Sequence, residues 1–118
     1  MSRVLPAVVV LLATLTACTS PSTAAVTVGP DTIVLDVRTP QEHAEGHLEG
    51  AQLLDLSGGQ FAAALPGLDP QAEYVVYCRS GNRSGQAVAL MEEAGFANVT
   101  DLGSLEDAAD ATGVTITR

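Results

Sequence analysis

The sequence contains no lysine and no tryptophan, and positive charge is scarce along its whole length. Across 118 residues, five arginines stand against fourteen acidic residues, which gives a formal net charge of −9 at pH 7. Such an acidic protein is not expected to bind nucleic acid non-specifically, and anionic lipid headgroups should repel it. Two tyrosines and two phenylalanines are the whole aromatic content. The length and composition allow one compact domain with a modest core and exclude two.

Long apolar runs are also rare, and the single pronounced one lies at the N-terminus. It follows Arg3 and extends from Val4 to Ala17. This run is shorter than the about 20 residues needed to span a bilayer, but it fits the hydrophobic part of an export signal. Residues 15–18 (Leu-Thr-Ala-Cys) resemble the lipobox of bacterial lipoproteins. An ordinary cleaved signal peptide, with the cysteine incidental, is the alternative.

This resemblance predicts three segments. Residues 1–17 are expected to be a lipoprotein signal peptide, and residues 18–25 a lipidated Cys18 followed by a flexible tether of small and polar residues. Residues 26–118 are expected to be the folded domain. The mature protein would then be exported and anchored to the cell membrane through its lipid alone, with the domain outside the cytoplasm.

The second of the two cysteines, Cys78, lies in the most informative segment of the chain. It ends the apolar run 74–77 and precedes a turn of small residues with two arginines, after which a helical pattern begins. Such a turn lets several backbone N–H groups point at one centre, and the positive end of the next helix adds to their field. These groups favour a thiolate, so we predict a reactive cysteine with a lowered pKa. The same turn would bind a small anionic substrate through Arg79, Ser80, Gly81, Asn82 and Arg83.

Two alternatives to this interpretation involve the same residues. The two arginines of the turn would be purely structural if they only paired with nearby carboxylates. The cysteine would be inert if it were buried, but a glycine turn flanked by arginines is a poor place to bury a thiol. With Cys18 lipidated, Cys78 has no partner in its own chain. A lone cysteine in an exported domain indicates a reactive thiol or, less readily, an intermolecular bridge.

Short β-type runs alternate with helical patterns along the rest of the domain. Strands are expected at residues 32–37, 51–54, 74–77 and 98–101, with a short edge strand at 26–28, and helices at 40–45, 59–65, 82–94 and 105–111. Thr39 or Asp36 should cap the first helix, and the buried face of the third should contain Ala87, Leu90, Met91 and Ala94. The alternation predicts an α/β fold with a small, mainly parallel five-stranded sheet and helices on both faces.

Three motifs, taken together, resemble the single-domain rhodaneses, the thiosulfate sulfurtransferase family. The first signature is residues 35–42 (Leu-Asp-Val-Arg-Thr-Pro-Gln-Glu) with residues 46–51 (Gly-His-Leu-Glu-Gly-Ala). Residues 78–84 (Cys-Arg-Ser-Gly-Asn-Arg-Ser) resemble the active-site loop, and residues 95–99 the segment after its helix. The resemblance implies a rhodanese-like fold and sulfur transfer through a cysteine persulfide, with no metal or organic cofactor.

Carried onto this sequence, the resemblance makes Cys78 the nucleophile that takes sulfur from a small anionic donor such as thiosulfate. The amides of residues 79–83 would cradle the persulfide, and Arg79 and Arg83 would attract the donor. Cyanide in an assay, or a thiol in cells, would be the acceptor. Asp36 and Arg38 would support the loop, with Arg38 pairing with Glu42.

Other patterns are weaker or depart from the family. Cysteine phosphatases carry an arginine where this chain has Ser84, so phosphatase activity is disfavoured. His43 and His47 have a metal-binding spacing, but Gly46 interrupts the helix between them and no third ligand is evident. In the resemblance, His47 belongs to a Gly-His turn, which implies a structural role for it. The helix at 105–111 lacks the tryptophan common in the family. The family's cleft shape and substrate preference are therefore not carried over to this chain.

The leading hypothesis is therefore an extracytoplasmic sulfurtransferase, monomeric by default. The alternative is a weakly catalytic or non-catalytic sulfur carrier or binding module for another exported protein. A third hypothesis is a redox role, in which Cys78 is oxidised and then recovered by a reductant.

Overall fold

The structure, a computed structural model, describes residues 25–118. The predicted signal peptide, Cys18 and the tether up to residue 24 lie outside the described residues, so those assignments stay predictions. In the described part of the chain, no helix has the length and apolar character needed to cross a membrane.

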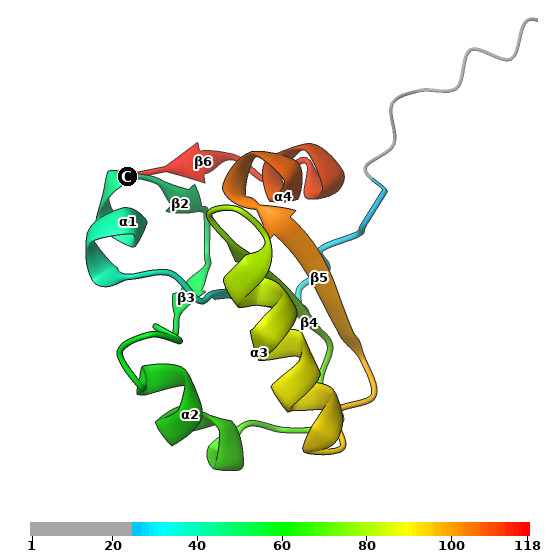
Figure 1. Cartoon of the computed structure of the whole chain (residues 1–118). Coiled ribbons are helices and arrows are strands. Elements are labelled where there is room, and N and C mark those ends of the chain that lie inside the picture. The colour runs from blue at the N-terminus through cyan, green and yellow to red at the C-terminus, as the bar shows by residue number, and fades with distance from the viewer. Residues whose placement is uncertain (1–24) are drawn as a thin grey trace, which may run out of the picture.

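A four-stranded parallel sheet forms the centre of the domain, in the order β3-β1-β4-β5 (Figure 1). The strands are β1 (Ile33–Asp36), β3 (Gln52–Leu53), β4 (Tyr74–Cys78) and β5 (Val99–Ser104). Every residue of β4 is buried, as expected of an interior strand covered on both faces. The predicted α/β class and parallel sheet are confirmed, but the sheet has four strands rather than five.

The missing fifth strand is the edge strand expected at residues 26–28. The Val26 N–H donates instead to the carbonyl of Ala111, at 2.9 Å. Val26 and Val28 pack beside the core formed under the last helix. The segment therefore pairs the Val26 N–H with a helix end and packs its two partly buried valines beside that core, without extending the sheet. A separate antiparallel pair, β2 (His47–Leu48) with β6 (Ile116–Thr117), was not predicted.

The helices lie close to their predicted positions. They are α1 (Pro40–Glu45), α2 (Gln60–Ala64), followed by the 3₁₀ turn η1 (Leu65–Gly67), α3 (Asn82–Glu93) and α4 (Leu105–Thr112). Thr39 caps α1, because its side chain accepts a hydrogen bond from the N–H of Glu42 at 3.2 Å. This residue, rather than Asp36, is the cap.

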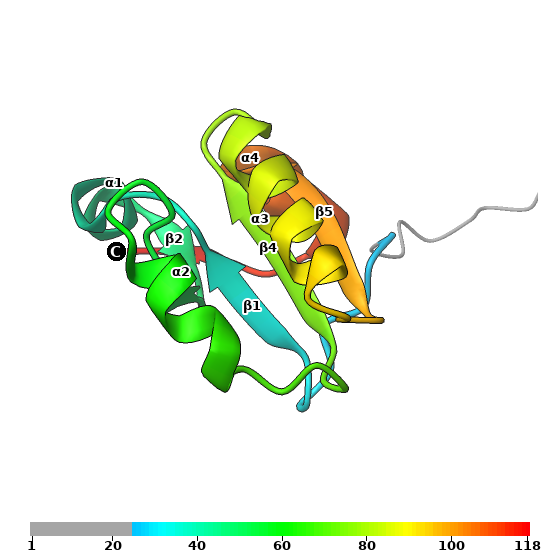
Figure 2. The same cartoon turned by 60° about the horizontal axis from the view of Figure 1, so that its bottom comes forward.

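The sheet separates two hydrophobic cores, because alternate side chains of β1 and β4 point to opposite faces. On one face, α2 and α3 cover the strands (Figure 2), and the core includes Leu35, Val76, Phe61 and Met91. On the other face, α4 covers a core that includes Val34, Val75, Tyr77 and Leu105. Helices thus cover both faces, as predicted.

The buried face of α3 differs from the predicted one. Ala87 and Met91 are buried, but Leu90 is 40% exposed, Ala94 is also exposed, and the third buried residue is Ser84. The buried face of α3 is rotated toward Ser84, because the Ser84 hydroxyl, in the first turn of the helix, packs under the loop that follows β4. This rotation matters for the site.

Candidate active site

Cys78 lies at the carboxyl end of β4, an interior strand of the sheet. This edge is where open parallel sheets place their ligand sites. The chain then turns at Gly81, which has a φ of +94° and directly precedes α3. A residue with a side chain would be strained in this left-handed conformation, so glycine permits the tight return of the loop onto the sulfur.

Two groups form hydrogen bonds with the Cys78 sulfur. The Gly81 N–H donates to Sγ at 2.9 Å, and the Cys78 thiol donates to the Ser84 hydroxyl oxygen at 3.3 Å. That hydroxyl donates in turn to the carbonyl of Gly81 at 3.1 Å. Ser84 is fully buried, and sequence reasoning gave it no role beyond excluding a phosphatase. Its position in the first turn of α3, three residues after Gly81, could have indicated contact with the loop, because that spacing returns a side chain to the start of a helix.

These contacts decide the ionisation of the sulfur. Burial on its own raises the pKa of Cys78. In the thiolate form, the Ser84 hydroxyl turns to the sulfur, and its hydrogen bond and those from the N–H groups of Ser84, Gly81 and Ser80 outweigh burial, so the pKa of Cys78 lies below its ordinary value. The direction is the predicted one, and the positive end of α3 acts in the same sense.

The exposure of the sulfur differs from the expectation. Cys78 has 0% exposure, although a buried cysteine was disfavoured by the sequence. The loop folds its amides over the sulfur, while Arg79, Ser80 and Asn82 remain exposed on its outer side. The glycine turn therefore encloses the thiol with the same N–H groups that stabilise its charge.

The two loop arginines are placed differently. Arg83 forms a two-pronged salt bridge with Glu42 of α1, with both N–O distances 2.9 Å. This pair holds the pKa of Glu42 below its usual range, and it raises the pKa of Arg83, to which the nearby Cys78 contributes. Arg79 makes no salt bridge within residues 25–118. Pairing with a nearby carboxylate, the structural role considered for both loop arginines, is therefore found for Arg83 but not for Arg79.

The expected pairing of Arg38 with Glu42 is wrong. Arg38 instead turns back to Asp36, with its Nε 2.9 Å from one carboxylate oxygen and its Nη2 2.8 Å from the other. Arg38 precedes the N-cap of α1 and so does not share the helix face of Glu42. Its guanidinium also donates to the carbonyl of Gly46 and lies over the ring of Tyr77.

Asp36 is the centre of a buried polar network beneath the loop. Besides Arg38, it accepts hydrogen bonds from His43 Nδ1 and from the Tyr77 hydroxyl, both at 2.9 Å. Burial raises the pKa of Asp36, but the Arg38 and His43 hydrogen bonds and the Arg38 charge bring it below its usual value. The network connects β1, α1 and β4, so Asp36 and Arg38 lie where a supporting role requires them.

The two histidines stack on each other, and the Nδ1 atom of each forms a hydrogen bond within the protein. Their rings stack at 3.8 Å, and His47 Nδ1 donates to the carbonyl of His43 at 2.8 Å. Within residues 25–118, no group of three or more His, Cys, Asp or Glu side chains is arranged to hold a metal ion. The predicted structural role of His47 agrees with these contacts.

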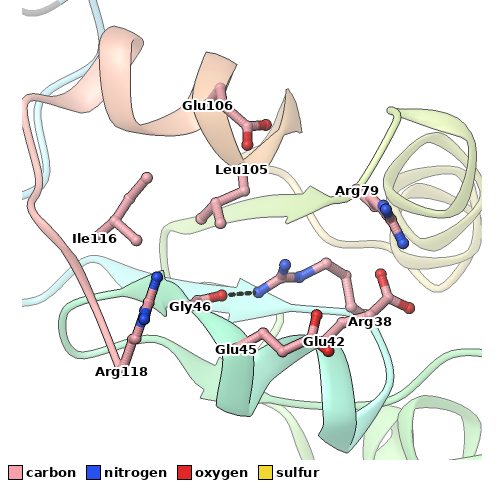
Figure 3. Close-up of a pocket in the computed structure, with 9 residues that line it drawn as sticks. All are labelled: Arg38, Glu42, Glu45, Gly46, Arg79, Leu105, Glu106, Ile116 and Arg118. Carbon is pink, nitrogen blue, oxygen red and sulfur yellow. Dashed lines mark hydrogen bonds between the residues drawn. The ribbon is translucent and has the colours of Figure 1, made fainter.

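A pocket of about 290 Å³ lies beside the loop (Figure 3). Part of its wall comes from the start of α4, the helix expected to border the cleft. Its lining residues are Arg38, Glu42, Glu45, Gly46, Arg79, Leu105, Glu106, Ile116 and Arg118.

The fold and the loop define a rhodanese-like domain, and comparison with known proteins agrees. The profile of the family described as "Rhodanese-like domain" matches residues 23–109, so the chain belongs to this family. Thiosulfate sulfurtransferase PspE of Escherichia coli is 35% identical over 77 residues, covering 64% of this chain and 72% of that protein. Thiosulfate sulfurtransferase GlpE of Pseudomonas entomophila is 39% identical over 67 residues, covering 57% of this chain and 60% of that protein.

Solved structures show the same fold. The rhodanese-like domain of the Alr3790 protein from Anabaena has a TM-score of 0.63 at 28% identity, covering 74% of this chain and 99% of that one. An E. coli structure described as a rhodanese with anions has a TM-score of 0.60 at 29% identity, covering 74% of this chain and 98% of that one. The family and these relatives support sulfurtransferase activity.

Proposed function

We propose that this protein is an extracytoplasmic sulfurtransferase that moves sulfane sulfur from thiosulfate, or a similar anionic donor, to a thiophilic acceptor through a persulfide on Cys78. The observation that carries the proposal is the hydrogen-bonded sulfur, with Gly81 N–H at 2.9 Å and the Ser84 hydroxyl oxygen at 3.3 Å. The Gly81 N–H, and the Ser84 hydroxyl once it turns to the ionised sulfur, stabilise an anion at the position where a nucleophilic thiolate is needed. Relatives named thiosulfate sulfurtransferase support the same chemistry.

The reaction proceeds in two steps. The Cys78 thiolate attacks the outer sulfur of thiosulfate, the bond between the two thiosulfate sulfurs breaks, and its electron pair leaves with sulfite. The product is Cys78–S–S⁻. Cyanide then attacks the terminal sulfur, the S–S bond to Cys78 breaks, and thiocyanate leaves while the thiolate is restored.

The loop takes part in both steps. The terminal sulfur of the persulfide lies about 2 Å beyond Sγ, so the N–H groups of residues 79–83 can follow the negative charge outward. Because Cys78 is covered in the free protein, the loop must move outward when the donor enters. Arg79, exposed and without a salt bridge in the described chain, attracts the anionic donor. Arg83 holds the loop to α1 through Glu42.

The test uses the purified full chain with thiosulfate and cyanide. Thiocyanate is expected from the parent protein and from the control Ser57→Ala, an exposed position outside the loop, but not from Cys78→Ala. After incubation with thiosulfate alone, intact-mass analysis should show one added sulfur atom on the parent and none on Cys78→Ala. Equal thiocyanate formation by the parent and Cys78→Ala would overturn the proposal.

The burial of Cys78 specifically favours one second candidate, a sulfur carrier for another exported protein. A covered persulfide is protected from small acceptors, so transfer would wait for a partner that opens the loop. The same mass measurement distinguishes the two functions. One added sulfur atom with negligible thiocyanate turnover would indicate a carrier.

The location is proposed from the N-terminal sequence alone. Signal-peptide cleavage before Cys18, followed by its lipidation, would tether a monomeric domain outside the cytoplasm. Cells grown with a labelled fatty acid should incorporate the label into the parent protein but not into Cys18→Ala. Equal labelling of both would contradict the anchor.

A further inference from the structure

The salt bridge between Arg83 and Glu42 cancels a positive charge beside the sulfur. Both terminal nitrogens of Arg83 lie 2.9 Å from oxygens of the Glu42 carboxylate, so the pair is bidentate. The charge of Cys78 contributes to the raised pKa of Arg83, which means that the guanidinium and the sulfur interact electrostatically. An arginine at this position without Glu42 would therefore add one full positive charge to the site.

Glu42 is held in place by its own helix as well as by Arg83. Its N–H donates to the Thr39 hydroxyl oxygen at 3.2 Å, and the Thr39 hydroxyl donates to a Glu42 carboxylate oxygen at 3.1 Å. Hydrogen bonds from Arg83 and Thr39 hold the pKa of Glu42 below its usual range, so the carboxylate is charged at neutral pH. The first turn of α1 thus fixes the group that compensates Arg83.

The other two arginines beside the loop differ in the same respect. Arg38, whose charge also acts on Arg83, is bound to Asp36 at 2.8 Å. Arg79 is exposed and forms no salt bridge within residues 25–118. Together with its N–H groups, the loop therefore offers an incoming anion one guanidinium that no carboxylate compensates.

Sulfur donors of the thiosulfate type differ in their charge. Thiosulfate carries two negative charges, whereas a thiosulfonate, in which a carbon group replaces one oxygen, carries one. We propose that the Glu42–Arg83 pair determines donor specificity by charge: because Glu42 cancels Arg83, the site is matched to a sulfane-sulfur donor with a single negative charge. This inference rests on the proposed sulfurtransferase function.

The first step of the reaction is the same for both kinds of donor. The Cys78 thiolate attacks the outer sulfur of the thiosulfonate, the S–S bond of the donor breaks, and its electron pair leaves with a sulfinate in place of sulfite. The product on the protein is again Cys78–S–S⁻. A change in the preference between the two donors therefore reports the charge of the site.

The test compares thiosulfate with methanethiosulfonate, in which a methyl group replaces one charged oxygen. Thiocyanate formation by the purified full chain with saturating cyanide gives kcat/KM for each donor at low ionic strength. The ratio of the thiosulfate value to the methanethiosulfonate value cancels changes in nucleophilicity or loop opening, which both donors share. Glu42→Gln should raise this ratio about threefold and Arg83→Gln should lower it about threefold, and high salt should reduce both shifts.

The opposite signs distinguish charge from structure. Each single variant breaks the same salt bridge, so a purely structural role would shift the ratio in the same direction in both. The double variant Glu42→Gln/Arg83→Gln restores the charge balance and should return the ratio to the parent value. Glu92→Gln, exposed near the far end of α3, is the control for the loss of one carboxylate and should leave the ratio unchanged.

Alkylation of Cys78 provides a readout that needs no sulfur transfer. Iodoacetate and iodoacetamide also differ by one negative charge, and the ratio of their rate constants should be highest in Glu42→Gln and lowest in Arg83→Gln. Unchanged ratios in the two single variants, or shifts in the same direction, would overturn the inference even if thiocyanate forms normally. Opposite shifts in alkylation, in a protein that makes no thiocyanate from either donor, would uphold the role of the pair and overturn the sulfurtransferase.

Discussion

Two buried groups at the same edge of the sheet hold negative charge in different ways. Asp36 ends β1 and Cys78 ends β4, the strand beside it, and both have 0% exposure. The Asp36 carboxylate is held by the guanidinium of Arg38, together with His43 and Tyr77. The Cys78 sulfur is held by N–H groups and one hydroxyl, and Arg83, whose charge interacts with it, is bound to Glu42.

The difference separates support from chemistry. A buried carboxylate in a fixed ion pair is neutralised and saturated with donors, so it is suited to anchoring β1, α1 and β4 together. Dipoles stabilise the thiolate without giving it a counter-charge, so its lone pairs remain available for attack. The same N–H groups can also follow the charge as it moves to the outer sulfur of a persulfide.

The largest expected effect comes from removing one side of the Asp36 pair. Asp36→Asn would leave the Arg38 guanidinium buried without its counter-charge, since Arg38 is only 4% exposed. We expect the free energy of unfolding to fall by roughly 3–5 kcal/mol, measured by urea unfolding followed by circular dichroism. The matched control, Asp110→Asn at an exposed site of α4, should change it by less than about 0.5 kcal/mol. A loss below about 1 kcal/mol for Asp36→Asn would show that the network is not the anchor.

A smaller effect is expected when one hydrogen-bonding group is removed from the Cys78 sulfur. Ser84→Ala removes the hydroxyl that lies 3.3 Å from Sγ, and this should raise the pKa of Cys78 toward its ordinary value. Losing one hydrogen bond to a charged group should lower sulfite release by about tenfold at neutral pH. The pKa follows from the pH dependence of alkylation at Cys78, read by peptide mass spectrometry. Ser57→Ala is the control, and an unchanged alkylation profile in Ser84→Ala would mean that the amides alone set the pKa.

The salt bridge between Arg83 and Glu42, which is more exposed than the Asp36 pair, should contribute less still to the free energy of unfolding. Arg83 and Glu42 retain 23% and 16% of their side-chain exposure, so solvent screens them more than the buried pair. Glu42→Gln should lower the free energy of unfolding by at most about 1 kcal/mol at pH 7. Because the folded-state pKa of Glu42 is lowered, its contribution is present above the unfolded pKa of about 4.3 and is lost as pH falls through the folded value.

The measurement is therefore the stability difference between parent and Glu42→Gln from neutral to acid pH. It should shrink toward zero as the pH falls. A difference that grows on acidification would contradict the pairing, and Glu92→Gln should show no comparable trend.

The sequence predicted most of the fold because its signals are local. The burial of β4 followed from an apolar run, and the Thr39 cap from a side chain beside Pro40. The partner of Arg38 was predicted wrongly because Arg38 turns back to Asp36, only two residues away, instead of reaching the helix. The partner of Arg83 was missed because it depends on how α1 packs beside the loop, which no spacing within the chain specifies. The burial of Cys78 was missed for a related reason, since one loop both exposes its arginines and covers its sulfur.

The smallest expected effect tests whether the dipoles do outweigh burial at Cys78. Since its folded-state pKa is lowered, the thiolate contributes stability that is fully present above the unfolded pKa of about 8.5 and is lost as pH falls through the folded value. The stability of the parent relative to Cys78→Ser should therefore rise as pH increases from neutral toward 8.5 and then level off. Urea unfolding at a series of pH values measures it. A relative stability that falls over the same range would mean that burial dominates, and the sulfur would then resemble an inert core thiol rather than a nucleophile.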